Sequence, residues 1–228
     1  MLDNPQIPFE DIKRNMQELN IVNTLLGGHR ITIKGFKKLL GDKKEIVVCE
    51  IGCGGGDNLF AIEKWCKKNN IKAELTGIDI NPNCIAFAKK QYPQFHFICS
   101  DYKDLSFEKR NDPDDTESLV HRPDIIFNSL FCHHFSTEEV AEILSWMHKN
   151  AATGFFINDL HRHPIAHYSI KILTKLFSNS YLVKHDAPLS VLRGFTKKEW
   201  QDILQKSDIK NAVLSWEWAF RHLIVASS

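Results

Sequence analysis

The stretch from Ile46 to Asn58, IVVCEIGCGGGDN, constrains the fold of this chain more than any other. It begins with a short apolar run and then places glycines at alternate positions, Gly52, Gly54 and Gly56. A short apolar run bounded by glycine is typical of a buried parallel strand, and glycine permits the positive φ angles of a tight turn. The helical pattern that follows would direct its free N–H groups at a ligand in the turn. We therefore predict an α/β domain with a nucleotide-binding turn at the carboxyl end of its first strand.

Two acids that flank the glycines, Glu50 and Asp57, indicate which ligand the turn binds. A dinucleotide fingerprint, Gly-x-Gly-x-x-Gly from Gly52, would need a glycine where Asp57 stands. Two carboxylates would serve a pyrophosphate poorly, whereas they would suit a cationic sulfonium and an ammonium group. The pattern Glu-x-Gly-x-Gly-x-Gly resembles the first motif of the class I S-adenosylmethionine-dependent methyltransferases. The resemblance implies that Glu50, Gly52, Gly54 and Gly56 bind this cofactor.

Further acids follow at the spacing of that family. Asp79 ends the second predicted strand, about twenty residues beyond the glycines, where a carboxylate can accept hydrogen bonds from both ribose hydroxyls. Asp101 and Tyr102 follow the third predicted strand. By the resemblance, Asp101 accepts a hydrogen bond from the adenine amino group, Tyr102 packs on the ring, and Ile80 belongs to the same cofactor-binding set.

The resemblance also implies the architecture. We expect an α/β fold with a Rossmann-like, seven-stranded, mostly parallel sheet, an antiparallel final strand and helices on both faces. Residues 1–228 are expected to form a single domain, since this length supports one substantial core. Residues 1–45 are expected to form an N-terminal helical cover or lid, and residues 160–195 a helical insertion on the substrate side after the fifth strand.

Composition excludes several classes of protein. Lysine and arginine number 29 against 28 acids, so no global basic field is available for nucleic acid. The six cysteines form no Cys-x-x-Cys pair, which argues against a bound metal and for a reduced, cytoplasmic location. No apolar run of about 18 residues is present, so we expect no membrane span.

The loop after the fourth predicted strand carries the candidate base. Asn128 ends that strand and is expected near the methionine part of the cofactor. His133 and His134 follow it, and an unperturbed imidazole titrates near neutral pH, as a general base requires. A metal cluster formed by Cys132 and the two histidines is the competing interpretation, but adjacent side chains diverge and the sequence offers no fourth ligand.

Four segments sharpen the resemblance. They are Leu-Gly-Gly-His-Arg near the start, His-His after the fourth strand, Asn-Asp-Leu-x-Arg after the fifth, and His-Asp-x-x-x-Ser-Val-x-Arg further on. Together they resemble a bacterial subgroup of methyltransferases that act on quinone-like, phenolic or polyketide-derived small molecules. On this resemblance the expected acceptor-binding residues are Arg30, Asp159, Arg162 and Arg193.

The predicted activity is methyl transfer from S-adenosylmethionine to a small, hydrophobic acceptor, with transfer to oxygen favoured over transfer to carbon. A nucleic-acid or protein methyltransferase remains an alternative, although Asn128-Ser129-Leu130-Phe131 stands where such enzymes carry Asn/Asp-Pro-Pro-Tyr/Phe. A non-catalytic cofactor-binding module is the other alternative. The apolar helices leave both a monomer and a homodimer open.

Overall fold

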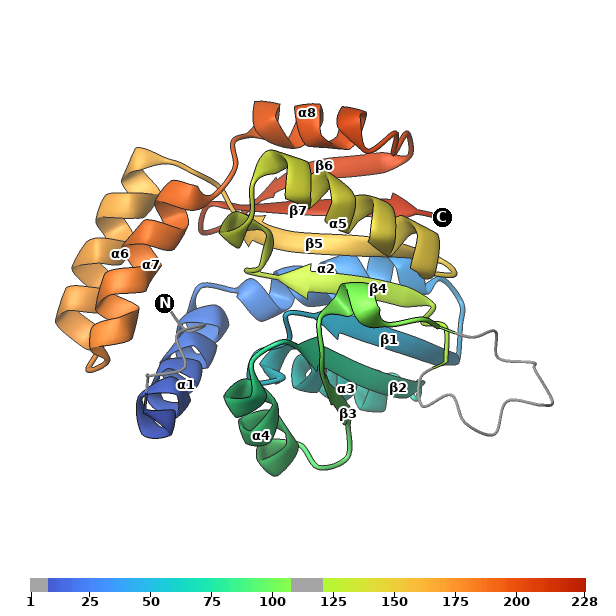
Figure 1. Ribbon diagram of the computed structural model, residues 1–228, viewed down its shortest axis with the longest axis horizontal. Helices are drawn as coiled ribbons and strands as arrows, with labels where there is room; N and C mark the ends of the chain where they lie inside the picture. The colour runs from blue at the N-terminus through green and yellow to red at the C-terminus, as the bar shows by residue number, and fades with distance from the viewer. Residues whose placement is uncertain (1–7, 108–120) are drawn as a thin grey trace.

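The computed structural model describes residues 8–107 and 121–228, and within them seven strands form one sheet (Figure 1). The strands are β1 (Glu45–Ile51), β2 (Lys72–Asp79), β3 (His96–Cys99), β4 (Ile125–Ser129), β5 (Gly154–Leu160), β6 (Ala212–Glu217) and β7 (Arg221–Ser227). The helices are α1 (Phe9–Leu25), α2 (Gly28–Leu40), α3 (Asp57–Lys68), α4 (Pro82–Gln91), α5 (Thr137–Asn150), α6 (Pro164–Phe177), α7 (Tyr181–Arg193) and α8 (Lys197–Lys206). Two 3₁₀ turns, η1 (Tyr102–Asp104) and η2 (Cys132–His134), follow β3 and β4.

The strand order is β3-β2-β1-β4-β5-β7-β6. Strands β1 to β5 run parallel, and β7 is antiparallel to both of its neighbours, β5 and β6. This confirms the predicted fold class. The chain leaves β1 toward one edge and β4 toward the other, and such a reversal point is where α/β sheets bind ligands.

Helices cover both faces of the sheet, as the alternation of buried side chains along the strands requires. On one face α2, α3 and α4 pack against side chains such as Val48 and Phe127. Gly35 allows α2 to lie close to the sheet, because a Cβ atom there would come within 2.6 Å of the Phe156 ring. On the other face α5 and α8 pack against side chains such as Ile126, with Trp200 fully buried among them.

Three helices lie outside these two layers. Figure 1 shows α1, α6 and α7 beyond the end of the sheet toward which the parallel strands point. Helices are present at the N-terminus and after β5, as predicted, and the insertion consists of two helices, α6 and α7. Within the described residues no helix combines the length and the apolar character needed to cross a bilayer.

Candidate active site

The loop between β1 and α3 brings the alternate glycines against side chains from other elements. Gly52 has a φ of 66°, and a Cβ atom there would come within 2.2 Å of the Phe131 ring. Gly54 has a φ of 51° and faces the Met16 sulfur from α1. The loop after β4 and the helix α1 therefore both close against the glycine turn, and neither position accepts a side chain without strain.

A buried acid ends β1 beneath this turn. Glu50 is 1% exposed, and its Oε1 accepts a hydrogen bond from Asn58 Nδ2 at 2.9 Å. Its other oxygen, Oε2, is buried and has no hydrogen-bond partner among the described residues. Burial, with Asp57 nearby, raises the pKa of Glu50 well above its ordinary value. A carboxylate oxygen with no partner inside a protein is costly, so the site is suited to a cationic or hydrogen-bond-donating ligand.

Side chains from α1, α2 and α3 extend this acid into a polar network. Asn58 Oδ1 accepts from Thr32 Oγ1 at 3.1 Å and lies 3.1 Å from His29 Nδ1. His29 Nε2 lies 3.4 Å from Asp57 Oδ2, a second buried oxygen without a hydrogen bond among the described residues. Burial raises the pKa of Asp57, and the His29 charge opposes that shift.

A buried arginine lies at the far end of the network. Arg221 opens β7, is 3% exposed, and donates a hydrogen bond from Nη2 to Asn23 Oδ1 at 2.8 Å. Asn158, at the end of β5, donates from Nδ2 to the Gly28 carbonyl at 3.1 Å. Burial lowers the pKa of Arg221 to about 10, while Asp159 and Asp57 act in the opposite direction. Arg221 is not among the predicted site residues, although an arginine just before the apolar Leu-Ile-Val-Ala stretch was an available signal.

Asp79, at the end of β2, reaches back to the glycine turn. Its Oδ2 accepts from the Gly54 N–H at 2.8 Å, and its Oδ1 accepts from the Asn81 N–H at 2.9 Å. The neighbouring Ile80 side chain is mostly exposed. The structure therefore brings the predicted ribose acid and the predicted glycine turn together.

Three other predicted cofactor residues make contacts with parts of the protein outside the glycine turn. Asp101 caps η1, where its Oδ1 accepts from the Lys103 N–H at 3.0 Å. Tyr102 is buried, and its ring packs edge-on against Trp146 of α5, with 5.0 Å between ring centroids. Asn128 is fully buried between the sheet and α5, and its Oδ1 accepts from the Cys132 thiol at 3.4 Å. The expected contacts of these three residues with the cofactor stay predictions.

A buried histidine–carboxylate pair joins the loop after β4 to the last residues of β5. His133 Nδ1 lies 2.7 Å from Asp159 Oδ1, and the His133 backbone N–H donates to Asp159 Oδ2 at 2.9 Å. Asp159 is 0% exposed and His133 4%. Burial by itself would raise the pKa of Asp159, but the His133 charge and three hydrogen bonds hold it below its ordinary value. Asp159 is therefore an ionised acceptor, which requires that His133 Nδ1 carry a proton.

The second histidine and the predicted arginines are more exposed. The ring centroid of His134 lies 4.3 Å from that of His133, and its side chain reaches the surface. Arg30 is exposed and folds over Gly27, while Arg162 pairs with Glu199 at the start of α8. Arg193 is the exposed last residue of α7. Among the described residues, the three arginines make no hydrogen bond to the His133–Asp159 pair.

No metal site accompanies these histidines in the parts of the chain that are described. Residues 8–107 and 121–228 contain no group of three His, Cys, Asp or Glu side chains arranged to hold a metal ion. The Cys132 thiol is engaged with Asn128, and burial raises its pKa well above the ordinary thiol value. The thiol is therefore held protonated, the form that does not ligate metals.

Known proteins share both the domain and the fold. Residues 48–154 match the family described as "Methyltransferase domain". The plantazolicin methyltransferase BpumL, solved with SAH, is 19% identical, with 95% of this chain and 88% of that chain covered and a TM-score of 0.66. No curated protein sequence matches the chain.

Two further solved structures are similar. Magnesium protoporphyrin IX methyltransferase from Synechocystis, with bound SAM, is 14% identical over 90% of this chain and 81% of that chain, with a TM-score of 0.56. Human N-acetylserotonin methyltransferase in complex with SAM is 16% identical over 96% of this chain and 56% of that chain, with a TM-score of 0.61. Identities this low show a shared fold, and the match over residues 48–154 adds a methyltransferase domain. The chain therefore carries a methyltransferase domain and has the fold of S-adenosylmethionine-dependent methyltransferases.

Proposed function

We propose that this enzyme transfers a methyl group to an oxygen of a small, hydrophobic acceptor of the phenolic, quinol or polyketide type. The observation that carries the proposal is the buried His133–Asp159 pair, whose histidine lies on the loop that packs Phe131 against Gly52 of the cofactor turn. A phenolic hydroxyl has a pKa near 10 and needs a base to become a good nucleophile at neutral pH. The position of this pair beside the turn supports transfer to such a hydroxyl.

The cofactor supplies a methyl group on a positively charged sulfur. We assign its binding to Glu50, Gly52, Gly54, Gly56, Asp79, Ile80, Asp101, Tyr102 and Asn128. Glu50 Oε2 and Asp57 Oδ2 are buried and accept no hydrogen bond from the described residues, which fits a ligand that carries a sulfonium and an ammonium. Asp79 lies against the glycine turn, because its carboxylate accepts from the Gly54 N–H, and this position supports its assignment as the acceptor for the ribose hydroxyls.

His133 has the geometry of a general base. Its Nδ1 proton is held by Asp159, which fixes the tautomer and leaves the lone pair on Nε2. No hydrogen bond to His133 Nε2 exists among the described residues, so this nitrogen can take the acceptor proton. The Asp159 carboxylate then stabilises the imidazolium that forms, without itself taking the proton. His134, stacked beside His133 and more exposed, is the alternative base.

The helices beyond the sheet would cover the acceptor. In this proposal residues 1–228 act as one domain, with the cover 1–45 and the insertion 160–195 on the acceptor side. Glu18 of α1 ties the two together, because its carboxylate accepts from the Asn179 and Ser180 N–H groups at 3.1 Å each. Arg30, Arg162 and Arg193 are the cations that could hold an anionic or enolic acceptor oxygen. The solved neighbours named for magnesium protoporphyrin IX and N-acetylserotonin support a non-polymeric acceptor.

A transfer assay tests the acceptor class directly. Cofactor with a deuterated methyl group would be incubated with the enzyme and, separately, with phenols, quinols, transfer RNA and a basic protein. The proposal expects label on the oxygen of a phenol or quinol. Label confined to RNA or protein, in a reaction that keeps its rate in excess phenol, would overturn it.

A further inference from the structure

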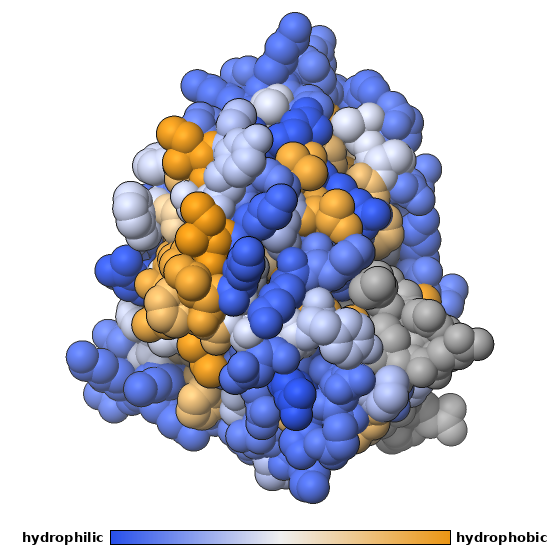
Figure 2. All heavy atoms as spheres, turned by 90° about the vertical axis from the view of Figure 1, so that its left-hand side faces the viewer, coloured by the Kyte–Doolittle hydropathy of each residue, from blue (hydrophilic) through white to orange (hydrophobic). Residues whose placement is uncertain are grey.

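The outer face of α6 is apolar and exposed. Large side chains recur along it at helical spacing, and each is at least 40% exposed: Ile165, Tyr168, Ile172, Leu173, Leu176 and Phe177. A surface helix normally turns such a stripe toward the core and a polar face toward water. Figure 2 looks onto the side of the molecule where α6 lies and shows hydrophobic side chains gathered in a strip.

Other positions of α6 are already used for packing. Ala166 and Thr174 are buried, and His167 Nδ1 lies 3.1 Å from the Pro188 carbonyl of α7. Helix α7 in turn lies against α1 and η2. The exposed stripe is therefore additional to the contacts that hold α6 in the fold, and an apolar surface of this kind marks an interaction site.

Basic side chains line one edge of the stripe. Lys171 and Lys175 each precede a stripe residue by one position, which places them about 100° around the helix from Ile172 and Leu176. Lys184 of α7 is also exposed, and none of the three lysines has an ion-pair partner among the described residues.

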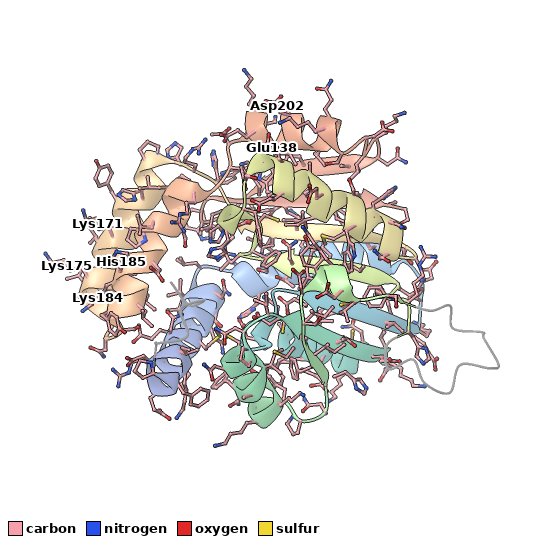
Figure 3. The ribbon with its side chains drawn as sticks, viewed as in Figure 1. Glu138, Lys171, Lys175, Lys184, His185 and Asp202 are labelled. Atoms are coloured by element: carbon pink, nitrogen blue, oxygen red, sulfur yellow. The ribbon has the colours of Figure 1, made fainter. Side chains whose placement is uncertain are left out.

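The hairpin formed by α6 and α7 carries a net positive charge. Its sequence from position 164 to 193 contains four basic residues and one acid, Asp186, whereas the entire chain is balanced at 29 to 28. Figure 3 shows Lys171, Lys175 and Lys184 together on the hairpin, with Glu138 and Asp202 on α5 and α8 away from it. Positive charge is thus concentrated where the apolar stripe is exposed.

We infer that the outer face of α6 docks on a lipid surface with anionic headgroups. An amphipathic helix lying in the interface buries its apolar side chains among the acyl chains and directs lysines to the phosphates. Docking on a second copy of this chain fits less well. Two-fold antiparallel packing of α6 on α6 would align the lysine edges of both copies on the same side, and α6 contains no acid to neutralise them. The inference does not depend on the proposed acceptor.

Sedimentation with vesicles tests this docking. The full-length protein is expected to bind vesicles of phosphatidylcholine with phosphatidylglycerol and to remain unbound with phosphatidylcholine alone. Because each lysine near an anionic surface contributes roughly a fivefold gain in binding, Lys171→Gln with Lys175→Gln should weaken binding about 25-fold. The matched control is Lys89→Gln with Lys90→Gln, an exposed pair on α4, which should leave binding unchanged.

Ile172→Glu tests the apolar component and should abolish binding while leaving the circular dichroism spectrum and the melting temperature unchanged, since Ile172 is exposed. Absence of binding to anionic vesicles would overturn the inference. So would binding that the α6 variants and the α4 control weaken equally. A concentration-dependent dimer that Ile172→Glu dissociates, without vesicle binding, would assign the face to a second copy instead.

Discussion

Asp159 accepts two hydrogen bonds from His133, one from ring Nδ1 at 2.7 Å and one from the backbone N–H at 2.9 Å. The two residues meet because β4 and β5 are parallel neighbours, so their carboxyl-terminal ends lie side by side. A carboxylate that accepts hydrogen bonds from both the ring and the backbone of a histidine fixes the position of the imidazole as well as its tautomer. Asp159 therefore positions the candidate base, His133.

Asp159→Asn should slow methyl transfer by about 10²–10⁴-fold, because the amide no longer fixes the Nδ1 proton of His133. Cofactor affinity should be unchanged, since the Asp159 carboxylate accepts its hydrogen bonds from His133 and from the Leu160 N–H. Steady-state kinetics and calorimetry measure the two effects. The matched control is Asp186→Asn, whose Oδ1 holds the exposed His185 at 2.9 Å and which should leave the rate unaltered. Equal rate losses in both variants would contradict the positioning role.

Asp79→Ala should weaken binding of S-adenosylmethionine and its demethylated product at least about a hundredfold. The variant would remove the two hydrogen bonds that the ribose hydroxyls are expected to donate to the Asp79 carboxylate. It would also remove the hydrogen bond from the Gly54 N–H to that carboxylate. Isothermal titration calorimetry gives both dissociation constants. Asp104→Ala removes an exposed carboxylate of η1 and serves as the control. Unchanged affinity in the Asp79 variant would remove this residue from the cofactor site.

Glu18→Ala should loosen α1 from the start of α7. Its carboxylate accepts from the Ser178 hydroxyl and from two backbone N–H groups, so the folded state should lose about 1–2 kcal/mol. Hydrogen exchange should accelerate in α1 and α7 and stay constant in β1. Glu10→Ala, on the same helix, breaks only an exposed pair with Lys13 and should have almost no effect. Protection that is identical in both variants would argue against the tie.

His222 should make the protein acid-sensitive. It is 2% exposed, and burial, with His161 close by, lowers its pKa to about 4. Below about pH 6.5 His222 binds a proton in the unfolded chain, whereas in the folded state it stays neutral down to about pH 4. The free energy of unfolding therefore falls by up to about 3 kcal/mol between these two pH values. Above about pH 6.5 the residue is neutral in both states and contributes no pH dependence.

Urea unfolding at several pH values measures this effect. His222→Gln should flatten the loss of stability between about pH 6.5 and pH 4. His185→Gln, on the exposed surface of α7, should leave the profile as it is. An unaltered slope in the His222 variant would show that another group causes the acid sensitivity.

The sheet and the cofactor turn could be predicted because their signals are local. The apolar run that ends at Ile51 and the glycines after it specify a strand and a turn within a few residues. The structure then brings Asp79 to Gly54, as the spacing indicated. The helical insertion over 160–195 was predicted without its division into two helices, α6 and α7; Ser180 caps the N-terminus of α7, and this helix continues through Pro188.

The buried polar network could not be predicted, because it depends on which elements meet in space. Asn23, Asn158 and Arg221 come from α1, β5 and β7 and are far apart in the sequence. Asp159 was expected to bind the acceptor, but its carboxylate is fully buried against His133, which favours a positioning role. The pairing of a strand-end acid with a loop histidine becomes visible only once β4 and β5 are known to be neighbours.

The most direct test of this account is the rate of methyl transfer by His133→Gln on a phenolic acceptor, measured together with its affinity for S-adenosylmethionine. The account predicts a fall of about 10²–10⁴-fold in kcat with an unchanged cofactor dissociation constant, and a loss of only a few fold in His134→Gln. Full turnover in the His133 variant, with cofactor binding intact, would contradict the assignment of His133 as the base.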